Sequence, residues 1–90
     1  MKLTSEASKE EIYQNVVSVL HEMFELDKSR LTMDAKLFTD LDIDSIDAID
    51  LVVKLNEITG KRIQPETFKA VRTIEDIVNA VHALLRGAEV

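Results

Sequence analysis

The stretch from Asp40 to Leu51 holds the residues whose types and spacing best suit chemistry. In it Ser45 follows Asp44 directly and stands before a run of apolar residues at helical spacing. Asp and Ser are preferred where a helix begins, because their side chains accept hydrogen bonds from free backbone N–H groups. We therefore expect Ser45 at or just inside a helix N-terminus, where the helix dipole and unpaired N–H groups favour an added phosphate.

A calcium loop is a second possibility for this stretch, since Asp40, Asp42 and Asp44 alternate as in the first half of an EF-hand. That loop needs Gly at its sixth position and a bidentate Glu at its twelfth. Here those positions hold Ser45 and Leu51. The sequence therefore predicts no specific calcium loop and no other metal site, because two histidines are also too few for histidine-ligated zinc.

A hydrolase nucleophile is a third possibility for Ser45. The Gly-x-Ser-x-Gly elbow is absent, and a serine nucleophile needs a base within hydrogen-bond reach. His21 and His82 are expected near the far ends of the first and last helices, away from Ser45. Nothing in 90 residues indicates a cleft that would perturb the acidic groups, so we expect a protein that is not an enzyme.

Local signals divide the chain into helices and one long connection. Ser8 and Glu11 form a capping-box pattern, Gly60 is a stop signal, and Thr73 suits a helix cap. The expected helices cover residues 8–25, 45–59, 65–69 and 73–85. The connection 26–44 has no clear period, and we interpret it as an ordered loop that crosses the bundle, pinned by four apolar residues: Leu31, Leu37, Phe38 and Leu41.

The composition agrees with this division. The chain is 46% hydrophobic, which is too much for a disordered segment. Two glycines, one proline and 4% aromatic residues argue against an all-β sandwich. We predict an all-α four-helix bundle of three longer helices and a short third one, in a single domain spanning residues 1–90.

The expected helix 45–59 has more apolar surface than one core face requires. One stripe, from Ala48 to Ile58, is enough to pack inward. A second strip is formed by Ile46, Ile49 and Val53, beside acidic residues. Two interpretations stay open: this strip is part of a broad core face, or it is a partner surface with an apolar centre and an acidic rim.

The net charge of −6 is concentrated around the same helix. An acidic surface disfavours nucleic acid and anionic membranes and favours partners that present Lys and Arg. The N-terminal residues lack an apolar core of signal-peptide length, and no apolar run approaches the ~20 residues of a membrane span. We expect a soluble, cytoplasmic monomer. Because the chain has no cysteine, any thiol that its function needs must come from a cofactor.

The segment Phe38–Ile46 resembles the attachment site of acyl carrier proteins. The family pattern is close to Phe-x-x-Asp/Glu-Leu-Gly-x-Asp-Ser-Leu, and its serine carries 4′-phosphopantetheine. The chain departs from it at Asp42, where Gly is usual, at Ile46, where Leu is usual, and in having one residue rather than two between Phe38 and Asp40. The resemblance covers nearly the whole chain in order and spacing.

The resemblance implies that Ser45 receives 4′-phosphopantetheine from coenzyme A and that acyl groups are carried on its thiol as thioesters. It also implies partners, namely a phosphopantetheinyl transferase and acyl-loading and chain-elongation enzymes with basic docking surfaces. The matching recognition residues are Asp44, Ile46, Asp47, Ile49, Asp50, Val53 and Glu57. The implied pathway is fatty acid synthesis or a polyketide or aryl polyene type of synthesis. The alternatives are an unmodified helical docking module, or a peptidyl or D-alanyl carrier.

Overall fold

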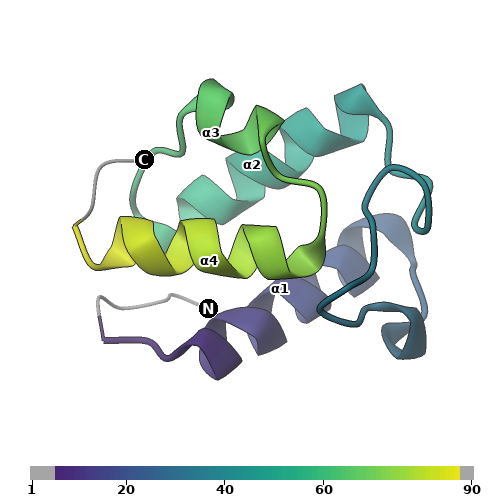
Figure 1. Ribbon diagram of the computed structural model, residues 1–90, viewed down its shortest axis with the longest axis horizontal. Helices are drawn as coiled ribbons and strands as arrows, with labels where there is room; N and C mark the ends of the chain where they lie inside the picture. Colours follow the sequence, from purple (N-terminus) through teal and green to yellow (C-terminus); the bar gives the residue numbers. More distant parts are fainter. Residues whose placement is uncertain (1–5, 88–90) are drawn as a thin grey trace.

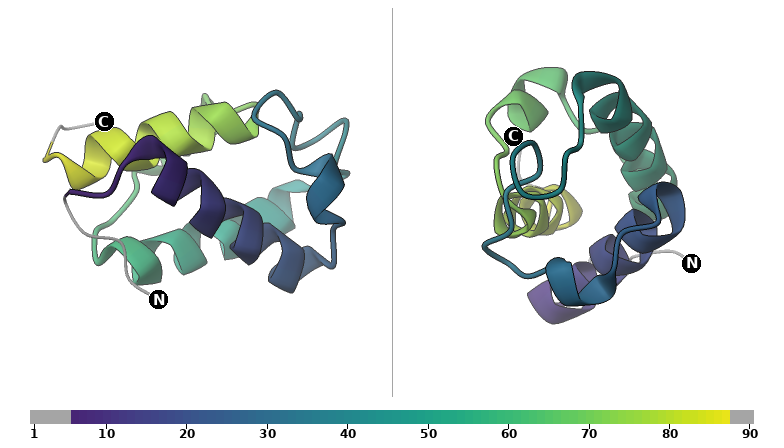
Figure 2. Two further views of the ribbon diagram at one scale, coloured as in Figure 1. Left: turned by 90° about the horizontal axis from the view of Figure 1, so that it is seen from below. Right: turned by 90° about the vertical axis from the view of Figure 1, so that its right-hand side faces the viewer.

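The computed structural model describes residues 6–87 as an all-α bundle, and the predicted fold class is confirmed. Figure 1 shows α2 and α4 running across the view with the short α3 above them, while Figure 2 shows α1 packed alongside α4. The only β pairing among the described residues is an isolated bridge between Lys36 and Thr73. The elements are α1 (Lys9–Phe24), the 3₁₀ helix η1 (Lys28–Arg30), α2 (Ser45–Thr59), α3 (Pro65–Lys69) and α4 (Ile74–Leu85).

The predicted helix ends are confirmed. They could be predicted because capping depends on residues that are close in sequence. Ser8 and Glu11 form the expected capping box at the start of α1. Thr73 caps α4 and forms a second capping box with Asp76. Gly60 ends α2 at φ 68°, a left-handed conformation that glycine adopts without strain.

The core lies where the apolar stripes of the three longer helices meet. Ile12, Val16 and Leu20 of α1 are fully buried, and so are Val78 and Val81 of α4. From α2, the expected inward stripe is buried at Ala48, Leu51, Leu55 and Ile58, and Val52 is half-buried. Each fully buried Val, Leu or Ile side chain contributes about 1.5–3 kcal/mol by leaving water, so the helices are held mainly through these stripes.

The connection between α1 and α2 closes one end of the bundle, at the right of Figure 1. Leu31, Leu37 and Leu41 are buried as predicted. The prediction for Phe38 is wrong, because this side chain is 47% exposed. The N–H groups of Asp40 and Leu41 both donate to the Lys36 carbonyl and close a turn. Phe38 lies in the middle of this turn, and its side chain is not part of the core.

Backbone hydrogen bonds attach the connection to the start of α4. Leu37 N–H donates to the Arg72 carbonyl at 2.9 Å, beside the Lys36–Thr73 bridge. Ile74 and Glu75 donate their N–H groups to carbonyls of the connection at 3.2 and 2.9 Å. These two N–H groups belong to the first turn of α4, and N–H groups in the first turn of a helix have no hydrogen-bond acceptor within that helix. The connection therefore satisfies the end of α4 while α4 fixes the path of the connection.

No helix within residues 6–87 combines the length and the apolar character that crossing a bilayer requires.

Candidate functional site

Ser45 is the first residue of α2, and its neighbour Asp44 performs the capping. The Asp44 carboxylate accepts a hydrogen bond from the Asp47 N–H at 2.8 Å. Ser45 is exposed, and within residues 6–87 its hydroxyl has no hydrogen-bond partner. The position expected from the sequence is confirmed. Because Asp44 caps the helix, the Ser45 oxygen remains free beside the N–H groups and the positive dipole end of α2.

The residues just before Ser45 are held in place by the connection. Ile43 is buried and donates its N–H to the Leu37 carbonyl at 2.9 Å. Asp42 has a φ of 55°, in the left-handed region that Gly, Asn and Asp tolerate best. Glycine, which the pattern resembled by this segment has at this position, adopts such a conformation without strain, and Asp tolerates it.

Two adjacent rows of exposed and half-exposed side chains run along α2. The apolar row consists of Ile46, Ile49 and Val53, which are 70%, 64% and 53% exposed. These values rule out the broad-core interpretation, because none of the three packs inward. The charged row consists of Asp47, Asp50, Lys54 and Glu57, at the same helical spacing.

The charged row is not uniformly acidic. The Lys54 ammonium lies 3.9 Å from the Glu57 carboxylate, and both side chains are well exposed. Such a surface pair contributes little stability, but it offsets the charge of Glu57. The excess negative charge of the row therefore belongs to Asp47 and Asp50, in the half of α2 nearer Ser45.

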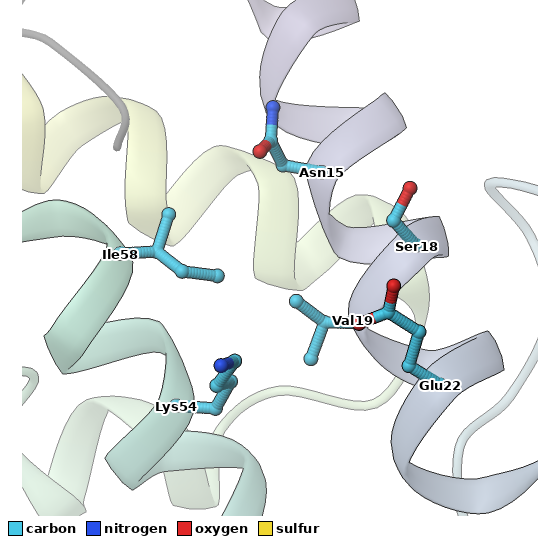
Figure 3. A pocket seen from close by; sticks show the side chains of 6 residues that line it. All are labelled: Asn15, Ser18, Val19, Glu22, Lys54 and Ile58. Carbon is cyan, nitrogen blue, oxygen red and sulfur yellow. The ribbon is translucent and has the colours of Figure 1, made fainter. Parts of the chain in front are cut away.

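A cleft of about 240 Å³ lies between α1 and α2, and Figure 3 shows side chains of the two helices facing each other across it. Lys54 lies nine residues beyond Ser45, which is about 180° around an α-helix. The cleft and Ser45 are therefore on opposite sides of α2, and a group on Ser45 is not directed into it. Its lining residues are Asn15, Ser18, Val19, Glu22, Lys54 and Ile58.

The other residues considered for chemistry are engaged locally. The Asp40 carboxylate accepts the Lys36 N–H at 3.0 Å. The carboxylates of Asp40 and Asp44 therefore each accept a backbone N–H and do not converge on an ion. In the described part of the chain, no three acidic or histidine side chains gather as a potential metal site. His21 contacts the Leu26 carbonyl at 2.8 Å, at the C-terminal end of α1.

Two side-chain contacts that hold the connection were not predicted. The Tyr13 hydroxyl donates to the Leu31 carbonyl at 2.5 Å, and the Arg30 guanidinium donates to the Asp40 carbonyl. Both join residues ten or more positions apart and end on backbone carbonyls, which every residue has. The sequence contains no signal for such a pairing.

Comparison with known proteins agrees with this geometry. A family model described as a phosphopantetheine attachment site matches residues 14–81. Acyl carrier protein 2 of Ralstonia nicotianae is 52% identical over 75 residues, which cover 83% of this chain and 93% of that protein. The acyl carrier protein of Thermotoga maritima is 35% identical over 79 residues, covering 88% and 98%.

The helical bundle and the matched attachment-site model define a phosphopantetheine-bearing carrier. The chain belongs to the acyl carrier protein family, and its prosthetic group is 4′-phosphopantetheine. The resemblance drawn from Phe38–Ile46 is confirmed, and so is the predicted cofactor. The residues at the start of α2 fit such a group, since an exposed hydroxyl stands where the helix favours a phosphate.

Proposed function

We propose that Ser45 is the residue that carries 4′-phosphopantetheine. The observation that supports this most is the division of roles at the start of α2, where Asp44 caps the helix and the Ser45 hydroxyl stays exposed and unpaired within residues 6–87. When bound, the prosthetic group supplies a thiol that holds acyl groups as thioesters. The chain itself supplies no thiol, because it contains no cysteine.

Loading of Ser45 is a phosphoryl transfer from coenzyme A. The Ser45 oxygen forms a bond to the β-phosphorus of coenzyme A, the bond from that phosphorus to 3′,5′-ADP breaks, and the serine proton passes to a base of the transferase. Phosphoryl transfer depends mainly on positioning and on electrostatic stabilisation of the phosphate. Ser45 contributes the oxygen, and the free N–H groups of the first turn of α2 favour the resulting phosphate ester.

The apolar row and the charged row of α2 form the docking surface for the transferase and for acyl-loading and chain-elongation enzymes. Ile46, Ile49 and Val53 supply the desolvated centre, and Asp47 and Asp50 attract basic groups. Asp44 and Glu57 flank the two ends of this surface. Charges at a rim act mainly on the rate of encounter, which suits a carrier that must leave each enzyme quickly.

The carrier serves fatty acid or polyketide-type synthesis in the cytoplasm, and the catalytic groups of these reactions belong to its partners. A peptidyl or D-alanyl carrier would use the same serine with a different cargo. A docking module that is never modified would use the surface of α2 without Ser45.

Intact-protein mass spectrometry tests the assignment. The apo protein is incubated with coenzyme A, Mg²⁺ and a promiscuous phosphopantetheinyl transferase, beside Ser45→Ala and Ser29→Ala. Ser29 is an exposed serine whose hydroxyl donates to Asp27 at 2.9 Å, so its variant controls for the loss of a surface hydroxyl. We expect one phosphopantetheinyl group on wild type and on Ser29→Ala, and none on Ser45→Ala. Loading of Ser45→Ala would refute the assignment, and no loading of wild type by several transferases would favour the docking module.

A further inference from the structure

Arg30 links two parts of the connection between α1 and α2 that lie apart in sequence. Its guanidinium donates to the Asp40 carbonyl, so η1 is joined to the turn 36–41. The turn is closed internally, because the N–H groups of Asp40 and Leu41 donate to the Lys36 carbonyl at 2.9 and 3.1 Å. The Asp40 carboxylate accepts the Lys36 N–H at 3.0 Å, which closes it from the other side. The turn is thus a compact unit, and Arg30 attaches it to η1.

The same turn leads directly to the modification site. Its Leu37 carbonyl accepts the N–H of Ile43, two residues before Ser45. On the other side, η1 is held to α1, because the Tyr13 hydroxyl donates to the Leu31 carbonyl at 2.5 Å. A continuous set of contacts therefore runs from α1 through η1 and the turn to the start of α2.

We propose that Arg30 is a positioning residue for the loading of Ser45, an inference that rests on the proposed function. Arg30 does not contact Ser45; it acts by holding the turn 36–41, and hence the start of α2, in one arrangement. Without this contact, a larger fraction of molecules has an open turn. An enzyme that binds only the closed arrangement then has an apparent affinity reduced by the fraction that remains closed.

The charge of Arg30 makes the direction of the effect diagnostic. Removing a positive charge from a protein of net charge −6 makes it more acidic. A transferase that presents basic groups would then associate faster if electrostatics alone mattered. Loss of positioning has the opposite effect and slows loading.

The test uses Arg30→Ala, the conservative variant Arg30→Lys, and the matched control Lys28→Ala. Lys28 lies in the same 3₁₀ helix and is exposed, and within the described residues its side chain makes no hydrogen bond or ion pair. Its variant therefore removes the same charge from the same element. Steady-state loading by a promiscuous transferase gives KM and kcat for each protein, and hydrogen exchange followed by NMR reports on the Asp40 and Leu41 amides.

We expect the protection of these two amides to fall about five-fold in Arg30→Ala, the effect of losing one hydrogen bond. Surface turns lie at the low end of local stability, so we expect KM to rise by up to the same factor while kcat is unchanged. Arg30→Lys retains a donor and is expected to restore most of both values. Lys28→Ala is expected to load at least as well as wild type.

An Arg30→Ala protein with the KM of Lys28→Ala overturns the proposal, whatever its exchange rates. An equal loss of protection at Val16 and Leu20 in α1 also overturns it, since the effect would then be a global loss of stability. Failure of the proposed function looks different, because wild-type protein itself would then gain no mass. The variants are therefore compared only after the wild-type protein has been shown to be loaded at Ser45.

Discussion

Reversing the charge of Asp50 tests whether the charged row of α2 guides partners. Asp50 is exposed, and among residues 6–87 its side chain has no hydrogen bond or ion pair, so Asp50→Lys is expected to change the free energy of unfolding by less than about 0.5 kcal/mol. For a basic partner group at about 7 Å, each unit of charge is worth about 0.6 kcal/mol in water. Reversal changes two units, or about 1.2 kcal/mol before screening.

The salt concentration determines how large the expected fall in loading rate is. With a Debye length of about 30 Å at ~0.01 M salt, screening leaves about four-fifths of the interaction, so kcat/KM for loading falls about five-fold. At ~1 M salt the Debye length is about 3 Å, and the ratio of variant to wild type approaches one. Initial loading rates, measured at several salt concentrations under subsaturating carrier, give the ratio directly.

Glu22→Lys is the matched control for this experiment. Glu22 is also exposed, and its reversal makes the same change in net charge. It lies on α1 and lines the cleft between α1 and α2, on the side of α2 opposite Ser45. We expect its loading rate to remain within about two-fold of wild type, because for a basic partner group about 20 Å away a charge reversal is worth only about 0.4 kcal/mol in water, before screening. An equal fall in both variants, or a fall in Asp50→Lys that persists at high salt, would refute local steering by this row.

Three further predictions concern the segments that present Ser45. Asp44→Ala removes the cap of α2, and we expect a loss of about 1 kcal/mol and a Tm lower by roughly 4–8 °C in thermal unfolding. Tyr13→Phe removes the hydrogen bond to the Leu31 carbonyl, and we expect about 1 kcal/mol lower stability in urea unfolding, with an unchanged m-value. The backbone N–H and hydroxyl of Ser29 both donate to Asp27 and hold the pKa of its carboxyl below its usual range. Its stabilising contribution is therefore present above the pKa of the unfolded chain and is lost as the pH falls through the lower folded pKa, so Asp27→Asn is expected to lower the Tm at neutral pH and to match wild type in acid.

The parts of this fold that could be predicted depend on neighbours in sequence. Ser8 with Glu11, Gly60 and Thr73 fix helix ends through bonds that span four residues or fewer. The apolar period then indicates which face of each helix turns inward. The position of Ser45 at the start of α2 could be predicted for the same reason.

The connection between α1 and α2 could be predicted only in part. Its leucines indicate burial, but the exposure of Phe38 depends on a turn closed by backbone groups, which carry no side-chain signature. The 3₁₀ helix η1 was not predicted, because three residues give no readable period. The contacts of Tyr13 and Arg30 join distant residues through carbonyls, and only the folded structure reveals them.

In the apolar row, stability alone would favour buried apolar side chains or exposed polar ones, whereas docking favours exposed apolar ones. Burying Ile46, Ile49 or Val53 would contribute about 1.5–3 kcal/mol for each side chain, yet all three are more than half exposed. The core does not need them, since α2 already packs through the stripe that includes Leu51 and Leu55. A solvent-facing row of this kind is retained where a partner covers it, and local violations of the usual pattern cluster at functional sites. The apolar row begins next to Ser45, so an enzyme that covers it would also lie against the serine that we propose to carry the arm.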